Sequence, residues 1–388
     1  YLPPPAIGGG PGYPGQTIAP GTQAVLGLGH SFGPTKYYEI RVGFSRLLED
    51  IVDADSVYGN LAERLGIPNA NAGGANGLTN FSISGTQGLG DGNGSLQKVN
   101  NIWEVDQALS WVKGSHELKF GFNWMSTRLG FYTPPHPNGT FSFNGSYTGY
   151  GLADFLYGRP TSSQLDITKY FSLMRFRPTF YFQDNWRVTS KLSLNFGLRD
   201  ELVTPWKERH NRLAGFDPSN GGNLVPVGTP PFSGDTITDG RYTNLAPRFG
   251  LAYSFNPKTV LRAGFGIFYA YETYNSNPQA KNAPFNGSLT VTNSTGLAGY
   301  AAALPISAGF PAARPDLFPA AGTVFQVFQR SYPNPSANEW NLNLQRQFTG
   351  HDMLSVAYVG QNGTHILINP NINMAVPGPG AVAPRRPY

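Results

Sequence analysis

The chain has 388 residues, with 48 Gly, 33 Pro and 13% aromatic residues but only 13% charged residues. Because a soluble globular chain usually carries about a quarter charged residues, part of this surface is expected to lie against something other than water. No run of about 18 apolar residues is present, which excludes a membrane helix, the lack of cysteine excludes disulfides and thiol chemistry, and the net charge of +5 comes from scattered Lys and Arg, so no nucleic-acid partner is expected.

Residues 1–20 are rich in Pro and Gly and are predicted to be a loop segment. Period-two alternation, which places successive side chains on opposite faces of a strand, begins after it. Tyr38, Ile40, Val42 and Phe44 alternate with polar residues after a turn at residues 33–35, and a weakly patterned strand precedes that turn near residues 23–31. This is the first predicted hairpin.

Four clearer hairpins follow in the chain. The second pairs residues 103–111 with 118–124 across a turn at 113–115, and the third pairs 180–188 with 192–198 across a turn at 189–191. The fourth pairs 249–255 with 261–269, and the fifth pairs 340–348 with 354–358. Two alternating runs joined by a short turn are typical of a β-hairpin. Five hairpins give about ten strands, each near the 9 to 11 residues that a tilted strand needs to cross a bilayer.

Long segments rich in Gly, Pro, Asn, Ser and Thr separate these hairpins at about residues 131–176, 204–245 and 271–335. Long unstructured connections are uncommon in compact soluble domains, whereas outer-membrane barrels combine short periplasmic turns with long extracellular loops. The predicted fold class is therefore all-β, an antiparallel transmembrane β-barrel of which the chain supplies about 10–12 strands, with long extracellular loops. Residues 151–158 are expected to form a short helix within one loop. A β-sandwich, whose core strands alternate in the same way, is the alternative.

The two faces of these strands differ in composition. The apolar face carries five tryptophans that are candidates for the aromatic girdles at the two membrane interfaces, namely Trp103, Trp111, Trp124, Trp186 and Trp340. The other face is polar and is expected to line the lumen or to pack on a plug; its candidates are Arg41, Lys119, Asn123, Asn195, Arg199 and Arg262. Asp184 and Arg346 interrupt the apolar face, and we expect them near a rim.

Several of these segments resemble a known family. The run YFQDNWRV at residues 181–188, continued by LSLNFGLR at 192–199, is similar to a hairpin of TonB-dependent outer-membrane receptors. The runs at 114–121, 244–250, 261–269 and 356–360 are similar to segments of the Oar-like subgroup of those receptors. The resemblance covers about residues 20 to 370, so we assign residues 21–370 to a receptor-like barrel segment and 371–388 to a Pro-rich loop segment.

The resemblance implies a 22-stranded barrel, an N-terminal plug, and energy supplied from the inner membrane through TonB. Neither plug nor TonB box is recognised in this sequence, so we expect an internal segment of a longer receptor, with outer-membrane lipid, a plug domain and the TonB complex as partners. The expected function is the barrel portion of a transporter or receptor in the cell outer membrane, with an unidentified substrate. The alternatives are an adhesion or structural barrel without active transport, and a soluble secreted β protein that binds carbohydrate.

Catalytic and cofactor motifs are not recognised. The six histidines lie far apart without the spacing of a metal site, and no Gly-x-Ser-x-Gly elbow or complete phosphate loop occurs. We therefore expect no enzyme activity and no cofactor.

Overall fold

The computed structural model describes residues 15–72, 74–91, 96–134, 136–271, 282–294, 296, 299, 303–312, 327–368 and 370–388. Within these ranges, no helix is both long enough and apolar enough to span a membrane.

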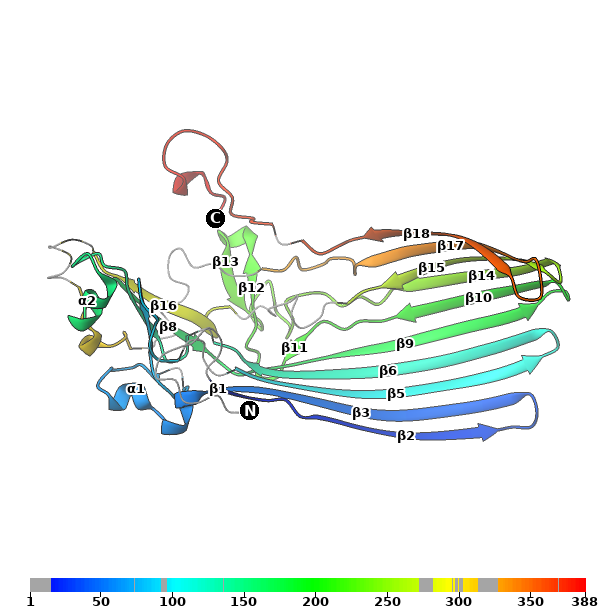
Figure 1. Ribbon diagram of the computed structural model, residues 1–388, viewed down its shortest axis with the longest axis horizontal. Coiled ribbons are helices and arrows are strands. Elements are labelled where there is room, and N and C mark those ends of the chain that lie inside the picture. The colour runs from blue at the N-terminus through cyan, green and yellow to red at the C-terminus, as the bar shows by residue number, and fades with distance from the viewer. Residues whose placement is uncertain are drawn as a thin grey trace.

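One antiparallel sheet of 12 strands dominates the molecule (Figure 1). Its main strands are β2 (Gly21–Ser31), β3 (Lys36–Asp53), β5 (Leu96–Lys113), β6 (His116–Tyr132), β9 (Phe171–Arg187), β10 (Leu192–Glu201), β14 (Leu245–Asn256), β15 (Thr259–Tyr269), β17 (Ser336–Gln347) and β18 (Met353–Thr364). They lie side by side in chain order, and two short strands, β1 (Gly15–Ile18) and β11 (Lys207–Glu208), pair with β3 and β9.

All five predicted hairpins are confirmed. They are β2–β3, β5–β6, β9–β10, β14–β15 and β17–β18. Their turns are short and lie together at one end of the sheet, which we call the turn end (Figure 1). In the two-residue turn between β5 and β6, Gly114 has φ 61, a conformation that costs glycine little. The other strand connections are long and lie at the opposite end.

Several strands are longer than the bilayer argument predicted. β3 and β5 have 18 residues each and β6 and β9 have 17, whereas β10 has 10 and β15 has 11. At about 3.3 Å per residue, 18 residues extend roughly 59 Å along the strand, or about 42 Å across a bilayer at a tilt of about 45°, which is more than its hydrocarbon core of roughly 30 Å. The far parts of these four strands, away from the turn end, carry the long connections.

The long connections are not unstructured, which corrects the expectation from composition. β4 (Asn80–Ile83), β7 (Thr140–Phe143), β8 (Ser162–Thr168) and β16 (Asn286–Thr292) form a second sheet in the order β16-β8-β7-β4. It unites residues from three connections, and one of them, residues 54–95, was not predicted to be a long loop. We call this unit the cap. The helix expected at 151–158 is confirmed as α2 (Gly151–Leu156), and α1 (Leu61–Arg64) precedes β4.

The cap has its own buried core. Phe141, Phe143, Phe81 and Leu165 from its sheet pack with Phe310, and the rings of Phe141 and Phe310 stack at 4.6 Å. Apolar side chains in an otherwise Gly-rich segment thus find enough partners to exclude water. Short 3-10 turns occur in the connections at Ala54–Tyr58, Pro218–Asn220 and Ile306–Ala308, and another follows β18 at Ala383–Arg385.

A second core fixes the connection between β10 and β14 against the main sheet. Leu129 and Phe131 of β6 and Phe171 and Leu173 of β9 pack with apolar residues of that connection, namely Leu213, Val227, Phe232 and Ile237. The same connection contains the hairpin β12 (Ala214–Asp217) and β13 (Asn223–Pro226). One face of β6 and β9 is therefore covered at the end away from the turns.

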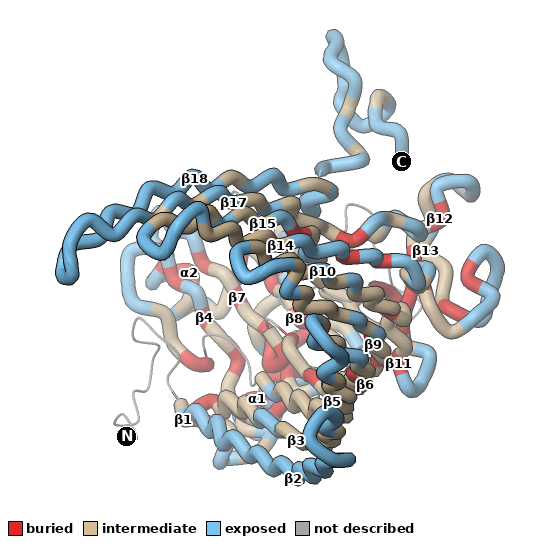
Figure 2. The backbone as a smooth tube through the Cα atoms, turned by 90° about the vertical axis from the view of Figure 1, so that its right-hand side faces the viewer, coloured by how far each residue is buried: buried red, intermediate tan, exposed pale blue. Residues whose placement is uncertain are grey.

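The sheet is bent but does not close. Figure 2, which is viewed from the turn end, shows β18 at one margin of the sheet and β2 at the other, with most of the buried residues behind the turns. Among the described residues, the outer edges of β2 and β18 pair with no further strand. β1 lengthens the β2 margin, and it lies within the segment predicted to be a loop.

Candidate functional site: the two faces of the main sheet

Strand register sorts the side chains into two continuous faces. One row runs Phe196, Phe249, Phe265 and Trp340 across β10, β14, β15 and β17. We call the side that carries this row the apolar face. Its side chains remain open to the surroundings, since Leu26 is 77% exposed, Phe180 53% and Tyr358 63%. Side chains of this kind on ten neighbouring strand segments form a patch far larger than a soluble monomer usually exposes.

All five candidate girdle tryptophans lie on the apolar face, at two levels. Trp111 and Trp186 lie beside the turns, whereas Trp103, Trp124 and Trp340 lie farther along their strands. Trp103 precedes Trp111 by eight residues, which corresponds to about 26 Å along a strand. A strand tilt of about 35–45° shortens this spacing to roughly 20 Å along the membrane normal, somewhat less than the apolar band of roughly 25 Å between aromatic girdles. Their role in a membrane stays a prediction.

The opposite side of the sheet, the polar face, carries all six lumen candidates. Most of them have polar partners: Arg41 pairs with Glu39, Asn195 contacts Asn185, and Arg262 contacts Gln345. Asn123 donates to Glu104 at 2.6 Å, and the Arg199 Nε donates to Glu201 at 2.6 Å. Lys119 lies between Ser110 and Gln183 in the register. The β10–β14 connection packs against this same side of β6 and β9, so the polar face is the inner one.

A cavity of about 310 Å³ opens on the polar face of β5, β6, β9 and β10. Its wall combines carboxylates, guanidinium groups and neutral polar groups: Glu104, Asp106, Asn123, Met125, Arg177, Thr179, Arg199 and Glu201. Glu201 also accepts a hydrogen bond from the Tyr271 hydroxyl, and the Arg177 guanidinium lies 5.0 Å from the Tyr271 ring centroid. Among the described residues, the Arg177 Nε has no hydrogen-bond partner. We call the eight residues that line this cavity the wall cluster.

Sequence alternation placed four of these eight residues on the inward face, namely Glu104, Asp106, Asn123 and Arg199, and missed the other four. Asn123 and Arg199 stood among the lumen candidates, whereas Arg177 and Glu201 did not. The alternation that places Tyr181 on the polar face continues through Thr179, Arg177 and Arg175. Pro178 hid this continuation, because a proline inside a run argues against a central strand. Here its carbonyl still accepts a bond from the Leu202 amide at 3.0 Å.

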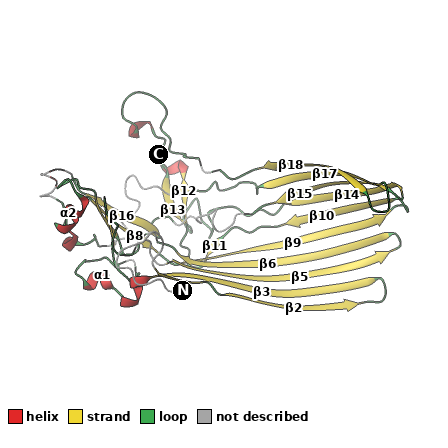
Figure 3. Cartoon of the chain, viewed as in Figure 1, coloured by secondary structure: helices red, strands yellow, loops and turns green. Residues whose placement is uncertain are grey.

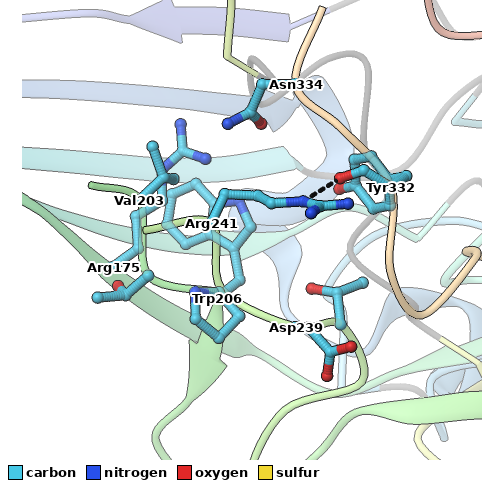
Figure 4. Close-up of a pocket in the computed structure, with 10 residues that line it drawn as sticks. Arg175, Val203, Trp206, Asp239, Arg241, Tyr332 and Asn334 are labelled. Carbon is cyan, nitrogen blue, oxygen red and sulfur yellow. Dashed lines mark hydrogen bonds between the residues drawn. The ribbon is translucent and has the colours of Figure 1, made fainter. Parts of the chain in front are cut away.

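A second, smaller cavity of about 30 Å³ lies where the β10–β14 connection meets β9 (Figure 4). The Arg175 guanidinium stacks 4.3 Å from the Trp206 ring centroid, and Arg241 reaches across to donate to the Tyr332 carbonyl at 2.6 Å. Asn334 donates to the Asn244 side chain at 3.1 Å. A space of this size holds water rather than a solute. The cavity therefore marks a joint between connections.

Two buried carboxylates organise the cap. Asp166 accepts bonds from the His136 amide at 2.7 Å, the His136 ring at 2.9 Å and the Ser288 hydroxyl. Burial acts to raise the pKa of Asp166, but its hydrogen bonds to His136, Ser288 and Gln164 together outweigh burial and lower that pKa. Burial dominates at Asp91 and raises its pKa to about 6, against the hydrogen bond from the Leu78 amide. Both groups tie distant segments together. Among the described residues, no cluster of three or more His, Asp or Glu side chains is arranged to hold a metal ion.

The sequence as a whole matches a known family model. The model is described as an outer membrane beta barrel domain, and the match extends over residues 1–388. No curated protein sequence matches the chain.

Three of the solved structures to which the chain is similar are transporters. The transporter YddB from Escherichia coli is 12% identical with a TM-score of 0.49, and the match covers 88% of this chain and 34% of that one. The copper transporter OprC is 11% identical with a TM-score of 0.47, and the match covers 89% of this chain and 39% of that one. The apoprotein form of the iron transporter FrpB from Neisseria meningitidis is 11% identical with a TM-score of 0.44, and the match covers 91% of this chain and 39% of that one. The chain thus spans between about a third and two fifths of the length of these proteins.

Proposed function

The chain belongs to the outer membrane beta barrel domain family, and we propose that it forms part of the barrel of a TonB-dependent receptor of the Oar-like subgroup. The protein lies in the cell outer membrane. In this proposal the barrel binds a substrate or moves it across that membrane, and the chain performs no enzymatic step. The subgroup and the link to TonB are supported by the hairpin motifs at residues 181–199 and their companions.

The observation that carries the proposal is the wall cluster. It places three acidic and two basic side chains around a cavity of about 310 Å³ on the inner face, while the outer face is apolar. A barrel whose apolar side meets lipid can keep such charges only where water or a polar partner reaches them. The polar face, with its six candidates, accordingly lines the lumen, and the cap lies at its extracellular mouth.

The open margins of β2 and β18 support further strands as partners. Their backbone groups face outward along strands of 11 and 12 residues, and a bilayer does not tolerate unpaired strand edges. In the proposal, strands from the rest of a longer receptor pair with both margins, a plug domain fills the lumen, and the TonB complex supplies energy. Charges of both signs on the polar face suit contacts with such a plug.

Untargeted mass spectrometry of spent growth medium tests this function even though the substrate is unidentified. A strain lacking the full-length gene is compared with the complemented strain, each with and without TonB. We expect at least one solute that the complemented strain depletes only when TonB is present. Identical depletion in all four cultures would argue against transport.

An adhesion role is the second candidate, because the cap exposes apolar side chains. Tyr150 and Leu156 at α2 are both 75% exposed, and Leu152 and Tyr157 are also exposed. α2 lies at the end of the molecule farthest from the turns (Figure 3). Loss of attachment to a surface on deletion of the gene, with unchanged solute depletion, would favour this role over transport.

A further inference from the structure

Two lysines share one tryptophan at the turn end of the apolar face. Lys36 begins β3 and is the register partner of Trp111 on β5, and Lys113 follows Trp111 by two residues on the same face. The Lys36 and Lys113 Nζ atoms lie 5.0 Å and 5.1 Å from the Trp111 ring centroid. Both lysines are exposed. Within the part of the chain that the structure describes, neither ammonium group forms an ion pair.

A carboxylate also lies near the turn end of this face, two strands from Trp111 in the register, and one of its oxygens is engaged. Asp184 accepts a hydrogen bond from the His116 ring at 2.8 Å, and that ring stacks on Trp186 with a centroid distance of 5.1 Å. This confirms that Asp184 lies near a rim, on β9 beside the turn. The two ammonium groups therefore face the surroundings with uncompensated positive charge.

An apolar groove continues from the lysine pair along the same face. It has a volume of about 520 Å³ and is lined mainly by side chains of β3, β5, β6 and β9, among them Tyr38, Leu109, Phe120, Phe122, Phe180 and Phe182. Leu109 lies two residues from Trp111, or about 7 Å along the strand. Phe120 packs on Phe182 at 5.1 Å and Phe122 on Phe180 at 5.0 Å, which forms a floor of paired rings.

Positive charge recurs along the turn end. Each hairpin carries a cation in or beside its turn: Lys36, Lys113, Lys191, Lys258 and Arg346. Arg346, which interrupts the apolar face, lies 5.4 Å from the Phe348 ring centroid. Since short turns mark the periplasmic side of such barrels, these cations lie at the level of the headgroups in the periplasmic leaflet.

We propose that Lys36, Trp111 and Lys113 bind the phosphodiester headgroup of an anionic phospholipid, with one acyl chain in the adjoining groove. The phosphate oxygens accept hydrogen bonds from the two ammonium groups, while the indole lies at the boundary between headgroup and acyl chain. The occupant is a lipid because the charged pair and the apolar groove are continuous and lie on the face that meets the membrane. The inference rests on residence in the outer membrane and not on transport.

Native mass spectrometry of the full-length protein in detergent tests the site. The probes are phosphatidylglycerol and phosphatidylcholine with identical acyl chains, and soluble glycerol phosphate as a competitor. We expect phosphatidylglycerol to bind more tightly than phosphatidylcholine, and the Lys36→Gln/Lys113→Gln variant to lose roughly tenfold to thirtyfold in affinity for it. Lys119→Gln, which removes a lysine from the other face of the same hairpin, should keep the original affinity. Glycerol phosphate should not displace the lipid.

Three results would overturn the proposal. They are equal affinity for the two lipids, an equal loss in the Lys119→Gln control, and full displacement of the lipid by glycerol phosphate. Phe122→Ala adds a separate readout, because shortening the groove wall should weaken both lipids equally. An unchanged affinity for both lipids in that variant would remove the acyl-chain part of the proposal.

Discussion

The indole ring of Trp340 lies directly over Gly360, its register partner on β18. A Cβ atom added at Gly360 would lie 2.4 Å from the ring. The missing side chain thus creates the space in which a large aromatic group lies flat on the neighbouring strand. Such pairing of an aromatic residue with a strand glycine stabilises a twisted sheet near its edge.

Gly360→Ala should therefore displace the Trp340 ring and lower the free energy of unfolding by about 1–3 kcal/mol. Urea unfolding of the protein refolded into lipid vesicles measures this change. Gly43→Ala on β3 is the control, because its added Cβ would meet Val25 at an ordinary 3.9 Å. Equal stability of the two variants would show that the ring does not depend on the glycine.

The main sheet was predictable from sequence because its signal is local. Alternation along Leu118, Phe120 and Phe122 is imposed by the membrane on one side and by water on the other, so both faces can be read from a single strand. The cap was not predictable in this way. Phe141 and Phe310 are more than 150 residues apart and pack together from segments whose Gly and Asn content is typical of loops. Only tertiary contact reveals them as core.

Asp166 should be essential to the stability of the cap. Asp166→Ala removes the acceptor for His136, Ser288 and Gln164, which belong to two connections. Because these partly buried donors would lose their acceptor, we expect a loss of about 1–3 kcal/mol and faster proteolysis of the cap. Asp235→Ala, which breaks the exposed ion pair with Lys207, should cost less than about 0.5 kcal/mol. Equal protease resistance of both variants would contradict this role.

The cap should be more stable at pH 5 than at pH 7 as far as Asp91 contributes. Its folded pKa of about 6 lies above the ordinary value of 3.8, so the native state binds more protons than the unfolded state between these values. The free energy of unfolding therefore falls as pH rises through this window. Thermal unfolding at several pH values should show this slope, and Asp91→Asn should flatten it by keeping the side chain neutral. A slope unchanged in Asp91→Asn would exclude Asp91 as its source.

Glu201 should hold the wall cluster together. Glu201→Ala leaves both the Arg199 guanidinium and the Tyr271 hydroxyl without this acceptor, and we expect a loss of about 1–3 kcal/mol. Glu63→Ala on the exposed surface of α1 should have little effect. A double-mutant cycle with Arg199→Ala isolates the pair, and a coupling energy near zero would show that Arg199 and Glu201 act independently.

The most direct test concerns the two faces themselves. Because this chain contains no cysteine, single cysteines can be placed at each position from 118 to 124 and spin-labelled in the full-length protein in lipid bilayers, with any cysteine outside this chain replaced first. Labels at the even positions, such as Phe120 and Phe122, should be accessible to oxygen dissolved in the lipid. Labels at odd positions, such as Lys119 and Asn123, should instead meet a water-soluble nickel reagent or be shielded from both. An alternation of the opposite phase, or none, would contradict a barrel with lipid outside and a polar lumen.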